Sequence, residues 1–258
     1  MNRDDEWNVD DDDAGADAGA FATIPGVYNY CDAWCERCIF QLRCAVFRDR
    51  VVMQAHMDVE RHASPAAGVD ATPAAGPATT SASPTPSLTS QALDEADVNL
   101  DDDIEQWETR RRKREVDPLY LHAREYADLA RAMLPALRQD IEATGDPLLQ
   151  ACLEAIQWHL YAIPVKVRRA LGSLHDPIFE NEDDPVQTDY NGTAKLVRLM
   201  MAESRRAWEA LLQSAGRRYP GRIAEMAERL GALDVGIANR FPLAMEFVRP
   251  GFDEQPEH

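Results

Sequence analysis

The stretch CDAWCERCIFQLRC, residues 31–44, contains four of the five cysteines of the 258-residue chain: Cys31, Cys35, Cys38 and Cys44. Thiolate sulfur is a soft ligand that suits zinc and iron–sulfur clusters. A structural zinc site usually joins two short cysteine pairs across a longer loop, and this stretch has no such loop. One chain that winds around a cubane reaches its iron corners with gaps of a few residues. The spacing therefore favours a [4Fe-4S] cluster, with zinc or free redox thiols as the alternatives.

The last three of these cysteines resemble the iron–sulfur loop of endonuclease III-type DNA glycosylases, which reads C-x6-C-x2-C-x5-C and holds a [4Fe-4S] cluster. The resemblance implies that Cys35, Cys38 and Cys44 are cluster ligands, but the gap from Cys31 to Cys35 is three residues instead of six. It covers only the segment CERCIFQLRC. Nothing else in the chain resembles the helix-hairpin-helix or the catalytic residues of that family, so the resemblance implies a cluster and not a glycosylase.

The segment CDAWCERC also has the C-x3-C-x2-C spacing of radical-SAM enzymes. Those enzymes usually carry an aromatic residue before the third cysteine, where this chain has Arg37, and they leave one iron open, which Cys44 can close here. They also need a partial α/β barrel, for which this chain has no room. The phrase IPGVYNYCDAWCERC is also similar to the start of an uncharacterised bacterial family of four-cysteine helical proteins, and that resemblance implies no activity.

Four aromatic residues lie close to the cysteines in the sequence: Tyr28, Tyr30, Trp34 and Phe40. We expect them to shield a cluster from water and so to tune its potential, or to pack this small segment against the rest of the protein. The fifth cysteine, Cys152, lies alone on an apolar helical stripe. It is interpreted as a small core residue.

Four polar residues in the predicted helices form a candidate for a second metal site: His122, Glu125, His159 and Glu203. A di-iron bundle places Glu-x-x-His pairs on facing helices. The chain contains no such pair, and His122-x-x-Glu125 has the spacing in reverse order. The alternative interpretation is that these are hydrogen-bonded polar residues at the edge of a helical bundle.

The motif TDYNGTAK, residues 188–195, has two interpretations. Asp189 or Asn191 is predicted to cap the helix that follows. The alternative is a polar pocket between helices, built by Asp189, Asn191 and Lys195 together with Lys166 and Arg169. The basic run RRRKR, residues 110–114, has acidic neighbours on both sides, so we interpret it as a salt-bridged or solvated helical face.

The sequence divides into five parts: a disordered acidic tail (1–20), a four-cysteine module with a following helix (21–62), a disordered Ala/Pro/Ser/Thr-rich linker (63–103), an α-helical bundle (104–250) and a second acidic tail (251–258). The fold class is all-α, with four or five helices in the bundle. Asp117-Pro118 and Asp146-Pro147 are predicted to start the first two, and Gly145 to end the first. Pro164 is expected to kink the second.

The formal net charge of −18 argues against nucleic acid and anionic membranes as partners. No apolar run reaches the length that spans a bilayer, and the acidic start does not resemble a signal peptide. We therefore expect a cytoplasmic protein in which clustered thiols bind a metal.

Together these features predict a metal-binding protein. Its [4Fe-4S] cluster would either staple the structure or transfer electrons to a protein partner. The alternatives are a metalloenzyme that uses the second site in the bundle and a zinc-stapled, non-catalytic interaction scaffold. The chain has neither a glycine-rich phosphate loop nor a serine-nucleophile motif, and the sequence does not decide whether the protein is an enzyme.

Overall fold

The computed structural model describes residues 22–63, 100–176, 183–214 and 219–253, and it is all-helical over these ranges. Its helices are α1 (Ala45–Ala63), α3 (Leu100–Glu115), α4 (Pro118–Thr144), α5 (Pro147–Leu174), α6 (Asp189–Ser214) and α7 (Pro220–Arg240), with the 3-10 turns η1 (Cys35–Arg37), η2 (Gln41–Arg43) and η4 (Ala244–Glu246). The predicted all-α fold is confirmed. The acidic tail 1–20 and nearly all of the predicted linker lie outside the described residues.

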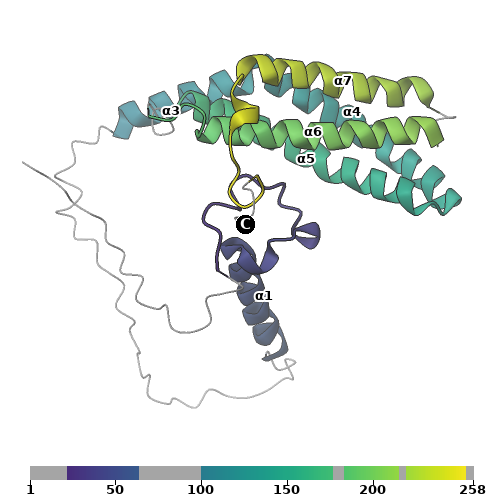
Figure 1. Ribbon diagram of the computed structural model, residues 1–258, viewed down its shortest axis with the longest axis horizontal. Coiled ribbons are helices and arrows are strands. Elements are labelled where there is room, and N and C mark those ends of the chain that lie inside the picture. The colour runs from purple at the N-terminus through teal and green to yellow at the C-terminus, as the bar shows by residue number, and fades with distance from the viewer. Residues whose placement is uncertain (1–21, 64–99, 177–182, 215–218, 254–258) are drawn as a thin grey trace, which may run out of the picture.

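Four long helices, α4 to α7, lie alongside one another and form the bundle (Figure 1). Helix α5 packs between α4 and α6, while α7 covers α4 and α6. Each helix contributes fully buried side chains to one continuous core, among them Tyr126, Ile156, Trp208 and Leu230. Burial of one such large apolar side chain contributes about 1.5–3 kcal/mol, so this shared core holds the four helices together.

The predicted helix boundaries of α4 and α5 are confirmed. The Asp117 carboxylate accepts a hydrogen bond from the Leu119 N–H at 2.9 Å, and Pro118 is the first helical residue. Gly145 ends α4 with a φ of 66°, a left-handed conformation that glycine adopts without steric cost. Asp146 then caps α5 in the same way as Asp117 caps α4.

The predicted apolar stripe of α5 is buried along its whole length: Leu149, Leu153, Ile156, Leu160, Ile163, Val167 and Leu171. One boundary differs from the prediction. The helical part begins at Leu100 and not at 104, because α3 extends through an acidic run expected to belong to the linker.

The RRRKR run lies on this helix, where Arg111 and Arg112 pair with Glu115 and Glu108 at 3.0 and 2.8 Å, as expected for a salt-bridged face.

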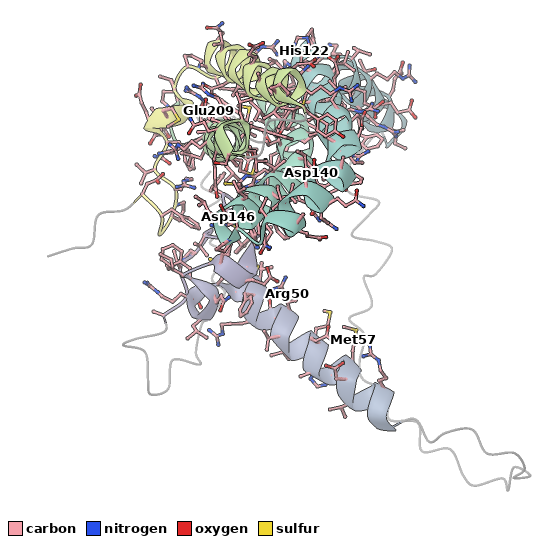
Figure 2. All side chains as sticks on the ribbon, turned by 90° about the vertical axis from the view of Figure 1, so that its right-hand side faces the viewer. Arg50, Met57, His122, Asp140, Asp146 and Glu209 are labelled. Atoms are coloured by element: carbon pink, nitrogen blue, oxygen red, sulfur yellow. The ribbon has the colours of Figure 1, made fainter. Side chains whose placement is uncertain are left out.

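The cysteine segment, residues 22–44, is irregular apart from η1 and η2. The Ile24 N–H donates to the Arg43 carbonyl at 3.0 Å, which ties the two ends of this segment together. Helix α1 follows the segment and projects away from the bundle in both views (Figures 1 and 2). No described helix is both long enough and apolar enough to cross a lipid bilayer.

Candidate metal centre

All four clustered cysteines lie on the wall of one pocket, which we call the cysteine pocket: Cys31, Cys35, Cys38 and Cys44. The pocket contains about 330 Å³ of empty space, part of it open to solvent. Much of the remaining wall is aromatic: Tyr28, Trp34, Phe40, Phe47 and Phe252. The structure thus brings the four thiols to one cavity whose wall is mostly apolar.

Tight backbone turns bring the four cysteines to this wall. Ala33 has a φ of 60°, a left-handed conformation that is uncommon for a residue with a side chain, and it turns the chain between Cys31 and Cys35. In η1 the Cys38 N–H donates to the Cys35 carbonyl at 3.1 Å. In η2 the Cys44 N–H donates to the Gln41 carbonyl at 3.4 Å. Because a 3-10 helix has only three residues per turn, two such turns reverse the chain over a short length.

Backbone groups also contact the sulfur atoms. The Phe40 N–H donates to Cys38 Sγ at 3.4 Å, and Cys31 Sγ donates to the Tyr28 carbonyl at 3.4 Å. A hydrogen bond from the Ala33 backbone lowers the pKa of the Cys31 thiol, although burial raises that pKa by more. Hydrogen bonds that a ligand sulfur accepts stabilise a more reduced iron–sulfur cluster. The bonds that Cys38 and Cys31 accept from the Phe40 and Ala33 backbones are of this kind, whereas the bond that Cys31 donates to Tyr28 exists only in the thiol form.

The thiols influence one another electrostatically. Burial raises the pKa of Cys35, and the neighbouring charges of Cys38 and Cys44 raise it further. Burial likewise raises the pKa of Cys38, with added contributions from Cys31 and Cys44. Four neighbouring thiolates repel one another unless a cation lies among them. Metal binding at this pocket would therefore release protons and remove that repulsion.

Basic side chains surround the cysteine pocket. The charges of Lys166 on α5 and Arg50 on α1 stabilise the thiolates of Cys31 and Cys35 respectively. Burial and the charge of Arg169 lower the pKa of Lys166, whereas Cys31 raises it. These cations partly offset the negative charge of the thiolates that line the pocket.

Stacked aromatic rings dock one side of the cysteine segment on the bundle. Trp34 stacks on Trp158 of α5 with ring centroids 5.1 Å apart, and the Trp158 indole N–H donates to the Asp32 carbonyl at 2.9 Å. The Arg37 guanidinium lies 4.2 Å from the centre of the Trp34 ring and pairs with Glu203 of α6 at 3.8 Å. The loop between two of the cysteines is thus fixed to α5 and α6.

A second contact docks the segment through Tyr30. Its ring packs edge-on against Phe247 at 4.7 Å, and its hydroxyl donates to Asp189 at 3.4 Å. Asp189 also accepts hydrogen bonds from Arg169 and Ser173. Of the four aromatic residues predicted to surround the cysteines, Tyr30 therefore serves docking, whereas the other three line the pocket.

Sequence reasoning missed Phe47 and Phe252. Phe47 follows the last clustered cysteine by three residues, a proximity that could have revealed it. Phe252 lies in the stretch expected to be an acidic tail, and no local pattern connects it with the cysteines. This expectation is corrected for residues 251–253: Phe252 packs edge-on against Phe40 at 4.9 Å, and Asp253 pairs with Lys195 and Arg249 at 2.7 and 2.9 Å.

The predicted second metal site is not assembled. Within the described residues, no three Cys, His, Asp or Glu side chains are grouped so that they could hold a single metal ion. His122 and Glu125 are exposed on α4, and Glu125 pairs with Arg229 of α7 at 3.1 Å. In Figure 2, His122 lies at the top of the bundle, far from the cysteine segment. His159 and Glu203 do lie together, 3.8 Å apart, as hydrogen-bonding or charged residues at the bundle edge.

The motif at residues 188–195 begins helix α6, and the side chains of Asp189, Asn191 and Lys195 are engaged in hydrogen bonds or ion pairs. Thr188, one residue before the expected caps, accepts the hydrogen bond from the Asn191 N–H at 3.4 Å. Asp189 forms an ion pair with Arg169, and the Lys195 ammonium donates to the Phe247 carbonyl at 2.6 Å. Cys152 is partly buried against the core, as its position on the apolar stripe predicted.

The chain matches no model of a protein family, no curated protein and no solved structure. The feature of this chain that bears most on its function is therefore the cysteine pocket.

Proposed function

We propose that the protein binds a [4Fe-4S] cluster through Cys31, Cys35, Cys38 and Cys44. The cluster would hold the cysteine segment in its docked conformation and exchange single electrons with a protein partner. The observation that carries this proposal is that all four clustered thiols line the wall of one pocket. Thiolates from a single short segment are the usual ligands of such clusters.

The placement of the four cysteines along the chain and on one pocket wall favours a cluster over a zinc ion. Zinc binds sulfur at about 2.3 Å, so four zinc-bound sulfurs must converge on one point. The four cysteines follow one another within one short segment that lines the pocket, without the longer loop that usually separates the two cysteine pairs of a structural zinc site. An iron–sulfur cubane has its own volume and meets each thiolate at a separate corner, which fits ligands arranged around a cavity.

Electron transfer fits the ligand set and the surroundings. Four cysteines close all four iron corners, so no iron is left open to bind and polarise a substrate. Much of the wall is aromatic, and Lys166, Arg50 and the Phe40 N–H compensate negative charge near the sulfurs. These features adjust the reduction potential of a cluster without supplying a catalytic group.

The test is anaerobic purification of the full chain, followed by measurement of iron, sulfide and zinc and by a visible absorption spectrum. We expect a brown protein with four iron atoms per chain, since a [4Fe-4S] cluster contains four. Cys38→Ser should lose this iron, whereas the matched variant Cys152→Ser should keep it. A colourless protein with stoichiometric zinc, or a Cys38→Ser variant with normal iron, would overturn the proposal.

The electron-transfer role is tested by a separate measurement, reversible reduction of the bound cluster. The bound cluster should accept one electron from dithionite and return it to an oxidant without loss of iron. A cluster that binds but cannot be reduced reversibly would leave only the role of holding the cysteine segment in place.

A further inference from the structure

His159 is a buried polar residue on α5. One of its ring nitrogens has a hydrogen-bond partner and the other has none. Its side chain is completely inaccessible to solvent. The Nδ1 atom lies 3.0 Å from the Ser204 hydroxyl, a hydrogen-bond distance. The Nε2 atom has no hydrogen-bond partner, and its distance to a carboxylate oxygen of Glu203 is 3.8 Å. A buried polar atom without a partner is costly, so its presence points to a role that needs the atom free.

The Nδ1 atom of His159 lies at one end of a series of buried, hydrogen-bonded side chains. Ser204 is hydrogen-bonded to the Tyr126 hydroxyl, which also accepts from the Trp208 indole N–H at 3.1 Å. Burial raises the pKa of Tyr126 to about 12, although these two hydrogen bonds lower it. Tyr126 therefore keeps its proton at neutral pH. When Nδ1 donates to Ser204, Nε2 presents an unshared electron pair on the side of Glu203.

The outer side of the imidazole faces the cysteine segment. The Trp34 ring packs edge-on to His159 with ring centroids 6.3 Å apart, and Trp34 also lines the cysteine pocket. One indole ring thus lies between His159 and the space proposed for the cluster. A charge in the cysteine pocket can therefore interact electrostatically with His159 across this ring, because a protein interior screens charges less than water does.

Charged groups from two neighbouring elements face His159: Glu203 on α6, and Asp32 and Arg37 on the cysteine segment. Burial lowers the pKa of His159, Glu203 and Asp32 raise it, and Arg37 lowers it. The net direction is downward, so the imidazole is neutral at pH 7. A small change in nearby charge is enough to move such a group between its two states.

We propose that His159 is the proton-binding site that compensates the charge of the reduced cluster. This inference rests on the proposed function. If a one-electron donor reduced a bound [4Fe-4S] centre by one electron, Nε2 of His159 would gain one proton. The new N–H bond forms with a solvent proton that passes through the half-exposed Glu203 carboxylate, and the imidazolium then pairs with that carboxylate. Each turnover therefore takes up one electron and one proton, and reoxidation releases both.

The test is the midpoint potential of the cluster-loaded full chain, measured from about pH 5 to about pH 8, around the usual pKa of histidine. Reduction coupled to one proton becomes easier as pH falls. We expect the potential to rise by about 59 mV for each tenfold increase in proton concentration over part of this range. His159→Gln, whose amide can still bond to Ser204, should give a flat profile. His122→Gln removes an exposed histidine of α4 and should keep the wild-type profile.

Glu203→Gln provides a second readout if His159→Gln folds poorly. Loss of the carboxylate removes a charge that favours the protonated imidazole, so the pH-dependent part of the profile should move to lower pH. Iron content, measured first, separates the two proposals. A chain without a cluster fails the proposed function, whereas a loaded wild-type chain with a flat profile, or an unchanged profile in His159→Gln, overturns the role of His159.

Discussion

At the scale of single residues, Lys166 is the cation that most directly affects the cysteine pocket. Its partly buried ammonium stabilises the thiolate of Cys31. The charge of Arg169 lowers the pKa of Lys166, whereas the charges of Asp189 and Asp32 raise it. A reduced cluster carries one more negative charge than an oxidised one. A nearby positive charge therefore stabilises the reduced form and raises the potential.

We expect Lys166→Gln to lower the midpoint potential of the cluster. The change should be on the order of one factor of ten in the reduction equilibrium, which is about 59 mV for one electron. Spectroelectrochemical titration measures this shift. Lys113→Gln is the control, because Lys113 is exposed on α3 and does not appear among the charges that affect the cysteines. A shift of equal size in both variants would show that overall charge, and not the position of Lys166, sets the potential.

The gathering of the four clustered cysteines on one pocket wall was predictable, because these residues are close together in the sequence, and their role as ligands stays a prediction. Their aromatic surroundings were predicted in part, since Trp34 and Phe40 are close neighbours of the cysteines. The contact between His159 and Trp34 was not predictable. It joins an internal face of α5 to a loop that is far away in the sequence, and the periodicity of apolar residues does not predict such long-range contacts.

At the scale of elements, the packing of α6 against the cysteine segment depends on Gly192. A Cβ atom at this position would lie 2.5 Å from a ring carbon of Tyr30 and 2.7 Å from one of Phe247. The absence of a side chain allows both rings to approach the helix. This glycine therefore permits the docking contact between α6 and the cysteine segment.

Gly192→Ala should destabilise the protein by about 1–3 kcal/mol, the usual cost of an added carbon atom in a well-packed site. Denaturant unfolding measures the change in free energy. The matched control is Gly221→Ala in the first turn of α7, where the added carbon would meet no atom within 4 Å. A Gly192→Ala variant as stable as Gly221→Ala would mean that the docking contact contributes nothing to stability.

The long helices were predictable because their signals are local. Helical apolar spacing defines the buried stripes, and an aspartate followed by proline marks the starts of α4 and α5. The cysteine segment lacks such a signal: Ala33 adopts a positive φ although its type gives no indication of it. Its conformation depends on contacts with α5, α6 and the C-terminal residues, which only the folded chain supplies.

At the scale of the whole molecule, Asp253 connects the C-terminal residues to the bundle and places Phe252 on the pocket wall. Burial raises the pKa of Asp253, but hydrogen bonds from Arg249 and Lys195 outweigh it and hold the pKa well below the usual range. For a carboxyl group whose pKa is lowered by folding, the stabilisation is complete above the unfolded pKa of about 3.9. It is lost as pH falls through the folded value.

Asp253→Asn should therefore be less stable than the wild type at neutral pH, and the difference should shrink as pH falls below about 4. Thermal unfolding at a series of pH values measures this convergence. The cluster of the variant should also be lost faster in air, because Phe252 is no longer held on the pocket wall. Asp58→Asn on α1 alters an exposed carboxylate and should change neither property. A stability difference independent of pH would show that the Asp253 ion pairs do not fasten the C-terminal residues.

The pocket wall joins Phe40, made early in translation, to Phe252, made far later. A nascent chain leaving the ribosome carries all four thiols long before it carries the ring that completes their enclosure. The four thiols therefore stay without this ring throughout most of synthesis. The pocket reaches its final form only when the C-terminal residues have been made and Phe252 packs against Phe40.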